Sequence, residues 1–417
     1  MKRRKSIKRS FLLIVLLIII IIITIFFINL TKNKEKDLYM IDLKDKNIDQ
    51  VKEIIKDLPL EVEYRYEYSD SIDADYVISQ SITSGTIINE GDIIQIVISL
   101  GKIDKEKLKN DGINELGKVP IMMYHGIKNM KNSETNYTGG NVDKDGYTRT
   151  SEAFRNDLET YYQKGYRMIK LSDYINGDID VEYGYSPIIL TFDDGNANNI
   201  KVTGIDSDGN IIIDSNSAVG ILEEYKKKYP DNNVTAIFFV TNNLFNQPEY
   251  NELIMKWLVD NGYEIGNHTK GHNNFSNIDT AKTQEVVGYM YNKLDSILGD
   301  KYSKIIALPF GSPYNKNHDN YKYIINGSYD GVEYQTEAAL RVGWEPEVSP
   351  FNKSFDKTFL KRCRAYDNNG VDFDIEMNLR ILEKNRYISD GRIDTTVTSS
   401  ENSDIINMSI DKEIILY

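Results

Sequence analysis

The sequence has almost none of the residues that build disulfides and thiolate metal sites. Cys363 is the single cysteine among 417 residues. An intramolecular disulfide and a thiolate zinc cluster are therefore both excluded. Histidine is also scarce, so any imidazole chemistry must use one of four side chains: His125, His268, His272 and His318.

Acidic residues outnumber basic residues beyond the first nine positions. The formal net charge is −13, and six Lys and Arg residues at positions 2, 3, 4, 5, 8 and 9 carry +6, which leaves −19 on the remainder. A protein that binds the phosphate backbone needs clustered Lys and Arg. The acidic body of this chain therefore argues against a nucleic-acid partner.

The long uncharged run at residues 11–30 reads FLLIVLLIIIIIITIFFINL. A helix of this length extends ~30 Å, which is the thickness of the hydrocarbon layer of a membrane. A cleavable signal peptide is the alternative, but its apolar region has ~7–15 residues and ends at small residues. We therefore expect an uncleaved anchor that crosses the cell membrane once. The basic segment 1–10 places the N-terminus in the cytoplasm and the rest of the chain outside the cell.

Residues 38–101 have the pattern of a small α+β module. Apolar residues recur at helical spacing in 47–57, and tyrosine and valine alternate with charged residues in 61–68. Two more strand-like runs follow at 76–79 and 93–99. A helix packed on a three-stranded antiparallel sheet is the simplest arrangement.

The segment YVISQSITSGTIINEGDIIQIVISLGK (76–102) resembles the PASTA family. That resemblance implies a module that faces the cell wall and binds peptidoglycan, and a spacer that binds nothing is the alternative. The next residues, 102–118, are charged and contain glycine. We expect them to form a linker.

From residue 119 to residue 417, strand-like and helix-like segments alternate. This alternation predicts an α/β fold built on a parallel sheet or barrel, in which chemistry collects where the strands end. The expected strands are 119–124, 187–192, 234–240, 263–266 and 304–308, and the expected helices are 151–165, 218–228, 252–261 and 280–298.

Polar residues gather at the ends of three of these strands. Asp193 and Asp194 are adjacent carboxylates, which repel each other unless a cation is near. His268 and His272, at i and i+4, can lie on one face of a helical turn and share a metal. One carboxylate with two imidazoles would leave coordination positions open for water and substrate. A lone HxxxH pair is weak evidence, but this pair holds half of the histidines and follows a strand.

The motif TFDDG at 191–195 and the HxxxH at 268–272 resemble the first two motifs of NodB-type polysaccharide deacetylases, the fourth family of carbohydrate esterases. The segments VPIMMYHGI (119–127), TAIFFV (235–240) and Pro309-Phe310-Gly311 are also similar to that family. The resemblance covers residues 119–365. It implies a distorted (β/α) barrel that hydrolyses an N-acetyl group on a sugar with the help of a metal.

Carried over by position, the resemblance implies a role for each motif residue. Asp193 is the general base, and Asp194, His268 and His272 bind one divalent metal. The backbone N–H of Phe310 helps to hold the oxyanion. Zinc is the expected metal, although cobalt and nickel accept the same ligands. We expect the substrate to be cell-wall glycan, with peptidoglycan as the first choice.

The sequence departs from the family pattern at two places. The third motif normally opens with an Arg that orients the base, and Ala307 stands there. Three arginines remain open as its replacement, and they are Arg341, Arg362 and Arg364. The family also places a general-acid His near the C-terminus, but no histidine follows His318.

His125 is the unassigned imidazole that the sequence places near the site, because it ends the strand 119–124. We expect it to deliver the proton that the departing amine needs, and a buried structural histidine is the alternative. Both departures leave a second function open. In that case the chain is a catalytically impaired protein on the same fold that binds wall polysaccharide.

Overall fold

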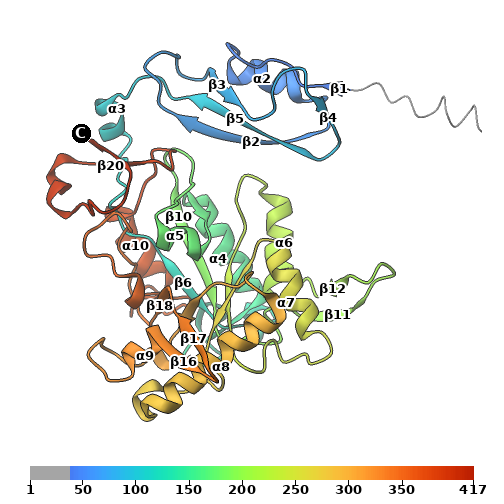
Figure 1. Cartoon of the computed structure of the whole chain (residues 1–417), viewed down its shortest axis with the longest axis vertical. Helices are drawn as coiled ribbons and strands as arrows, with labels where there is room; N and C mark the ends of the chain where they lie inside the picture. Colours follow the sequence, from blue (N-terminus) through green and yellow to red (C-terminus); the bar gives the residue numbers. More distant parts are fainter. Residues whose placement is uncertain (1–37) are drawn as a thin grey trace, which may run out of the picture. The chain divides into compact units, whose positions relative to one another are not determined.

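The computed structural model describes residues 38–417, so the predicted anchor at 11–30 and the segment 1–10 lie outside the described residues. Within 38–417, no helix is long and apolar enough to cross a membrane. The chain divides into two compact units after Ile103 (Figure 1).

The first unit is a small α+β module. Helix α2 (Ile48–Ile55) begins at Asn47, whose side chain forms a capping box with Gln50. Its buried face packs on a sheet with the strand order β2-β5-β3, and the strands β1 and β4 form a separate short pair. The strand bounds are β1 Leu38–Tyr39, β2 Leu60–Glu67, β3 Val77–Gln80, β4 Ile87–Ile88 and β5 Asp92–Ser99.

The predicted all-antiparallel sheet of this unit is wrong for one pair. Strand β5 is antiparallel to β3 but parallel to β2, with Leu60 opposite Asp92 and Glu67 opposite Ser99. Because β5 occupies the centre, β2 and β3 lie on its two edges and do not pair with each other. The residues alone predict the strands, but not which strand takes the central place.

Residues 104–118 differ from the predicted linker, because they fold as part of the second unit. Helix α3 (Lys105–Asn110) begins at Asp104, whose side chain accepts a hydrogen bond from the Lys107 backbone N–H. Leu108 and Ile113 are fully buried. The charged residues of this segment cover a few well-spaced apolar side chains, which its composition hides.

The second unit contains the predicted parallel sheet. Seven strands pair in the order β18-β15-β14-β13-β10-β6-β19, each parallel to its neighbours, and β9 pairs with the start of β10. A single parallel bridge between Leu340 and Leu360 links strand β18 to the segment that precedes β19. The bounds are β6 Ile121–Tyr124, β9 Tyr166–Met168, β10 Ser186–Phe192, β13 Ile237–Val240, β14 Glu264–Asn267, β15 Ile305–Ala307, β18 Ala338–Leu340 and β19 Cys363–Arg364.

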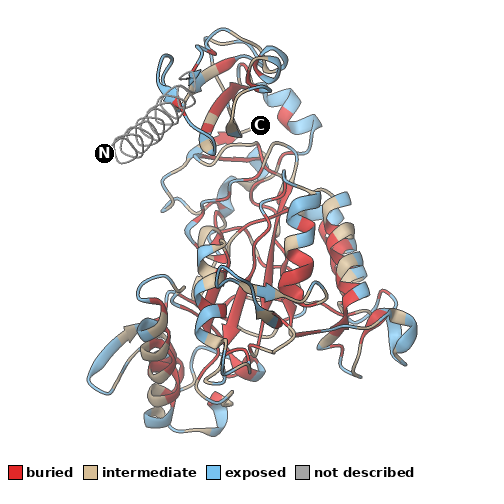
Figure 2. Cartoon of the chain, turned by 90° about the vertical axis from the view of Figure 1, so that its right-hand side faces the viewer, coloured by how far each residue is buried: buried red, intermediate tan, exposed pale blue. Residues whose placement is uncertain are grey.

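Both faces of this sheet are buried, as Figure 2 shows for its central strands. Consecutive residues such as Ile189 and Leu190, or Ile237 and Phe238, belong to two different hydrophobic clusters. Parallel strands covered on both faces are continuously apolar for this reason. The covering helices are α4 Ser151–Gln163, α5 Leu171–Asn176, α6 Ala218–Lys228, α7 Asn251–Asp260, α8 Thr280–Leu298, α9 Tyr321–Ile325 and α10 Ile375–Asn385.

Local side chains fix where the longer helices begin. The side-chain oxygens of Thr150, Ser217 and Asp279 accept hydrogen bonds from backbone N–H groups in the first turns of α4, α6 and α8. Each such cap is worth about 1 kcal/mol. The helix starts expected at 151, 218 and 280 are therefore confirmed.

The second unit also contains short two-stranded pairs outside this sheet. The pair β11–β12 is an antiparallel hairpin after TFDDG, and Asp206 accepts hydrogen bonds from the backbone N–H groups of Asp208 and Asn210 in its turn. The remaining bounds are β7 Gly126–Lys128, β8 Thr148–Thr150, β11 Val202–Ile205, β12 Ile211–Ile213, β16 Asn326–Tyr329, β17 Val332–Gln335, β20 Thr395–Thr398 and β21 Glu413–Leu416.

Candidate active site

The carboxyl ends of four parallel strands meet at one cavity of the second unit. His125 follows β6, Asp193 and Asp194 follow β10, His268 follows β14, and the turn containing Phe310 follows β15. Parallel strands deliver their carboxyl ends to the same edge of a sheet. The structure accordingly brings all six predicted site residues to one cavity of about 310 Å3, lined by His125, Asp193, Asp194, His268, His272 and Phe310.

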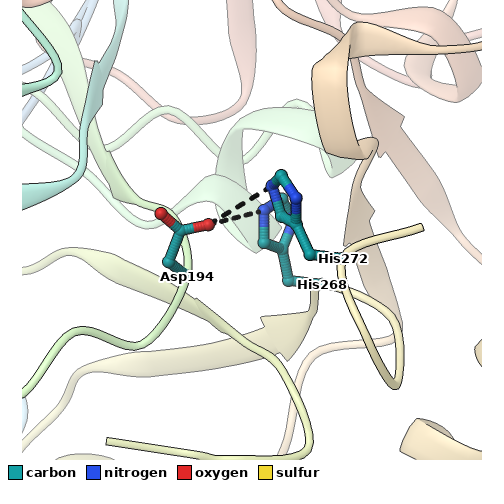
Figure 3. Close-up of side chains that lie close together, drawn as sticks. All are labelled: Asp194, His268 and His272. Carbon is teal, nitrogen blue, oxygen red and sulfur yellow. Dashed lines mark ion pairs between the residues drawn. The ribbon is translucent and has the colours of Figure 1, made fainter. Parts of the chain in front are cut away.

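Asp194, His268 and His272 converge on one point (Figure 3). The Asp194 Oδ1 atom lies 3.3 Å from His268 Nε2 and 3.4 Å from His272 Nε2. The ligand atoms of the three side chains all lie within 4.8 Å of one another. An oxygen and two imidazole nitrogens at this spacing fit the ligand shell of a divalent metal such as zinc.

The surroundings of His268 support a metal-binding role for its ring. His268 Nδ1 lies 2.9 Å from the carbonyl oxygen of Ala307, which can only accept, so Nδ1 carries the proton. Nε2 then keeps its lone pair, and it is buried without a hydrogen-bond partner. A ligand histidine is normally held by its second nitrogen in this way. Burial lowers the His268 pKa, but the Asp193 and Asp194 carboxylates outweigh it and raise the pKa, so the site attracts positive charge.

The backbone of the site is strained. Asp194, Thr269, His272 and Phe310 have φ angles of 75°, 65°, 52° and 59°, in the left-handed region that non-glycine residues avoid. Each such residue costs about 1–3 kcal/mol and persists where the surrounding structure imposes it. Strain of this kind clusters at functional sites, and here it falls on two of the three clustered side chains and on the third motif.

Asp193 is held by an arginine from a distant part of the sequence. Arg362 is fully buried and donates two hydrogen bonds of 2.7 Å to the two carboxylate oxygens of Asp193. It also donates to Thr191 Oγ1 and to the Arg341 carbonyl oxygen. Burial raises the Asp193 pKa, but the Arg362 charge and hydrogen bonds, together with the neighbouring His268 and His125, outweigh burial, and the pKa lies well below its ordinary value. The carboxylate is therefore ionised and can accept a proton.

This contact decides among the three arginines that the sequence left open. Arg341 lies over the Phe359 ring at 4.9 Å, and Arg364 lies over the Tyr147 and Tyr366 rings at 5.0 Å and 4.3 Å. Arg362 alone among the three contacts Asp193 in the described residues. Arg362 therefore makes the contact with Asp193 that the resemblance implies for the arginine missing at Ala307.

His125 is a second neighbour of Asp193. Its Nε2 atom is 4.0 Å from Asp193 Oδ2, and its ring meets the Tyr147 ring edge-on at 4.8 Å. Burial lowers the His125 pKa, while Asp193 and Asp194 oppose that effect. The Asn199 side chain donates a hydrogen bond to the His125 carbonyl oxygen, which fixes the backbone at this strand end.

Comparisons with known proteins agree with the geometry. A family model described as "Polysaccharide deacetylase" matches residues 181–323, and a model described as "PASTA domain" matches residues 39–100. The chain carries a PASTA domain and a polysaccharide deacetylase domain. Asp193, Asp194, His268, His272 and Phe310 all lie within the deacetylase match, whereas His125 and Arg362 lie outside it.

Solved structures of deacetylases are similar to this chain at low identity. The Streptococcus pyogenes deacetylase PplD in complex with acetate is 18% identical, with 60% of this chain and 93% of that chain covered at a TM-score of 0.43. IcaB from Ammonifex degensii is 16% identical, with 60% and 92% covered at a TM-score of 0.37. A three-PASTA-domain structure of a Ser/Thr kinase from Staphylococcus aureus is 16% identical, with 31% and 80% covered at a TM-score of 0.15. No curated protein matches the chain.

Several residues of the deacetylase domain reach the cavity without belonging to a motif. Tyr147 directly precedes strand β8, Thr148 begins that strand, and Asn196 and Val342 follow strands β10 and β18. The Phe310 ring, 53% exposed, meets the His272 ring edge-on at 4.6 Å. Nothing in the sequence marks Tyr147 or Val342, because their position depends on loops that fold back from distant strands.

Proposed function

We propose that this protein is a metal-dependent hydrolase that removes N-acetyl groups from the amino sugars of cell-wall polysaccharide, with peptidoglycan as its substrate. The observation that carries this proposal is the pairing of two neighbouring carboxylates with different partners. Asp194 lies with His268 and His272, and Asp193 lies with Arg362. Adjacent carboxylates in these two settings can divide the tasks of holding a metal and accepting a proton. We also propose that the curved parallel sheet serves as the distorted (β/α) barrel of this family.

Each side chain has a task in amide hydrolysis. A divalent metal held by Asp194, His268 and His272 would polarise the acetamide carbonyl and make water more acidic. Asp193, kept ionised by Arg362, accepts the proton of the attacking water. The Phe310 backbone N–H donates to the oxygen that develops negative charge. His125 delivers a proton to the nitrogen of the departing amine.

The three ligands fit zinc, and cobalt or nickel could take the same positions. Neutral imidazole and an ionised carboxylate are the forms that bind a metal. Three protein ligands also leave coordination positions for water and substrate, which a catalytic site requires.

We further propose a place for the protein in the cell. The uncharged run at 11–30 follows a basic segment, so the chain would be a single-pass protein of the cell membrane with its N-terminus in the cytoplasm. The deacetylase domain would then act outside the cell, and the PASTA domain would hold the enzyme at the cell-wall glycan.

A binding protein without catalysis is the second candidate, because Ala307 replaces the motif arginine and no histidine follows His318. Arg362 and His125 offer replacements for both groups, which favours the enzyme. The test is acetate release by the purified protein from peptidoglycan and from chitooligosaccharides, with and without a metal chelator. We expect release that the chelator abolishes and that added zinc restores. Glycan binding without any acetate release would establish the second candidate.

A further inference from the structure

A second cavity of about 540 Å3 opens beside the catalytic one. We call it the aromatic cavity, because four aromatic side chains line it together with polar residues. The aromatic residues are Tyr137, Trp344, Tyr366 and Phe373, and the charged residues include Asp145, Arg364 and Asp372.

Tyr147 and Arg364 connect the linings of the two cavities. Tyr147 lines the catalytic cavity, where its ring meets His125 at 4.8 Å. The Arg364 guanidinium, which lines the aromatic cavity, lies 5.0 Å from the same Tyr147 ring. Val342 and Trp344, two residues apart in the sequence, also connect the linings of the two cavities. Val342 lines the catalytic cavity, and Trp344 lines the aromatic cavity. A ligand group in one cavity is therefore a neighbour of a group in the other.

The walls of the aromatic cavity are fixed before any ligand binds. The Asn141 side chain donates a 2.7 Å hydrogen bond to the Asp367 carbonyl oxygen, which ties the loop around 137–145 to the segment after β19. Arg149 donates to Asn141 Oδ1 and to the Gly139 carbonyl oxygen, and it is itself buried in an ion pair with Asp157. A site whose walls are already ordered loses less entropy when it binds.

The lining of the aromatic cavity suits a sugar ring. Trp344 and Tyr137 are 54% and 46% exposed, so they present flat apolar faces to solvent. A pyranose has C–H bonds on its faces and hydroxyls around its edge, so it can stack on aromatic rings while its hydroxyls bond to charged side chains. Charges of both signs line the cavity, which does not favour a polyanion. Aromatic walls with a few polar groups are typical of sites for small organic ligands.

We propose that the aromatic cavity is a glycan subsite, which binds the pyranose next to the one that is deacetylated. This inference rests on the proposed function, since the catalytic cavity must hold the reacting sugar. The polymer would cross the boundary at Tyr147, with one sugar stacked on Trp344 and its neighbour at Asp193. The protein should then act on oligomers far better than on single sugars.

Binding can be measured without activity, because the chain has only two tryptophans, Trp257 and Trp344. In a full-length Trp257→Phe variant, the fluorescence reports Trp344 alone. We expect a saturable change with N-acetylglucosamine tetramer and none with the monomer at the same concentration. A Trp344 signal that no oligomer changes would overturn the subsite.

Steady-state kinetics provide a second test of the subsite. Trp344→Ala should raise the KM for the tetramer by about tenfold, as expected for the loss of ~1.4 kcal/mol, and leave kcat/KM for the monomer unchanged. Trp344→Phe should keep most of the tetramer affinity. The control is Ile212→Ala on the β11–β12 hairpin, a similarly exposed side chain that lines neither cavity.

The outcomes separate the two proposals. Acetate release with equal tetramer KM in Trp344→Ala and the parent protein refutes the subsite and keeps the deacetylase. A tetramer-dependent Trp344 signal without acetate release from any sugar refutes the deacetylase and keeps the aromatic cavity as a glycan site.

Discussion

Asp193 and Glu115 are both hidden from solvent, with exposed fractions of 2% and 0%, but their partners differ. Asp193 receives two hydrogen bonds from the Arg362 guanidinium, and its pKa lies well below the ordinary value despite burial. Glu115 accepts hydrogen bonds from the Tyr387 hydroxyl and two backbone N–H groups, and it lies beside Asp390. Burial and the Asp390 charge raise its pKa well above the ordinary value.

The difference shows what a buried carboxyl group needs before it can act as a base. Burial by itself favours the neutral acid. At Asp193 a nearby cation keeps the charge, whereas at Glu115 three hydrogen-bond donors do not offset burial and the Asp390 charge. The protein places a fully buried arginine at Asp193, the residue that we propose as the proton acceptor. At Glu115 the carboxyl group instead joins the segment before β6 to the residues around strand β20.

The largest expected effect is the loss of turnover when a proposed metal ligand or the proposed base is replaced. His268→Ala should lose bound metal, and acetate release should fall to background. Asp193→Asn should keep its metal and lose turnover by about 10²–10⁴-fold, the usual value for a lost general base. Metal analysis and an acetate assay on the same preparations distinguish the two. Glu115→Gln is the matched control and should retain both metal and turnover. Full metal occupancy in His268→Ala would remove that residue from the ligand set.

His125 gives the next test, because a general acid matters only for a poor leaving group. His125→Asn should lose about 10²–10⁴-fold in amide hydrolysis. It should keep most of its activity on 4-nitrophenyl acetate, whose leaving group departs without a proton. The ratio of the two rates is the measurement. An equal loss on both substrates would give His125 a structural task instead of proton delivery.

The Arg362–Asp193 pair should also contribute to stability. Arg362→Met leaves a buried carboxylate without its cation, which typically costs about 3–5 kcal/mol. We expect a loss of that size in the free energy of unfolding, measured by urea denaturation, together with reduced turnover. Asp193→Asn combined with Arg362→Met should recover part of the stability, since the stranded charge is gone.

Arg341→Met is the matched control for this variant. Arg341 lies near the same strand ends but stacks on Phe359, so its removal should cost much less. If Arg362→Met and Arg341→Met had equal free energies of unfolding, the contact between Arg362 and Asp193 would not stabilise the buried carboxylate.

The sequence predicted the grouping of Asp194, His268 and His272 better than it predicted the partner of Asp193. Asp194, His268 and His272 follow strands whose apolar runs are easy to find, and parallel pairing brings strand ends together without further information. Arg362 lies 169 residues after Asp193. The sequence identifies it only as one of three arginines. No pattern in the sequence predicts that the residue before β19 contacts the residue after β10.

The elements of the fold also differ in how well the sequence predicts them. Helices α6 and α8 occupy the predicted residues, because the apolar spacing and the caps are local. The strands β18 and β19, with two or three residues each, are too short to show a period. The packing of segment 104–118 on the second unit and the parallel β2–β5 pair depend on contacts between residues far apart in the chain.

The smallest expected effect is a pH dependence at Glu115. Its pKa is raised above the ordinary value of 4.5 in the folded protein, so the folded state binds the proton more tightly than the unfolded state does. The stabilisation is complete below the ordinary pKa and is lost as the pH rises through the folded value. The loss amounts to at most about 1.4 kcal/mol for each pH unit.

Glu115→Gln cannot ionise, and its altered hydrogen bonds with Tyr387 and Val397 add an effect that does not change with pH. The free energy of unfolding of the parent protein minus that of Glu115→Gln should therefore fall as the pH rises from about 5 to about 8. Asp193 does not interfere, because a carboxylate with a lowered pKa stays ionised across this range. Urea denaturation of both proteins at each pH measures the difference. A difference that stays constant with pH would mean that burial does not raise the Glu115 pKa. The comparison between the pKa values of Glu115 and Asp193 would then be wrong.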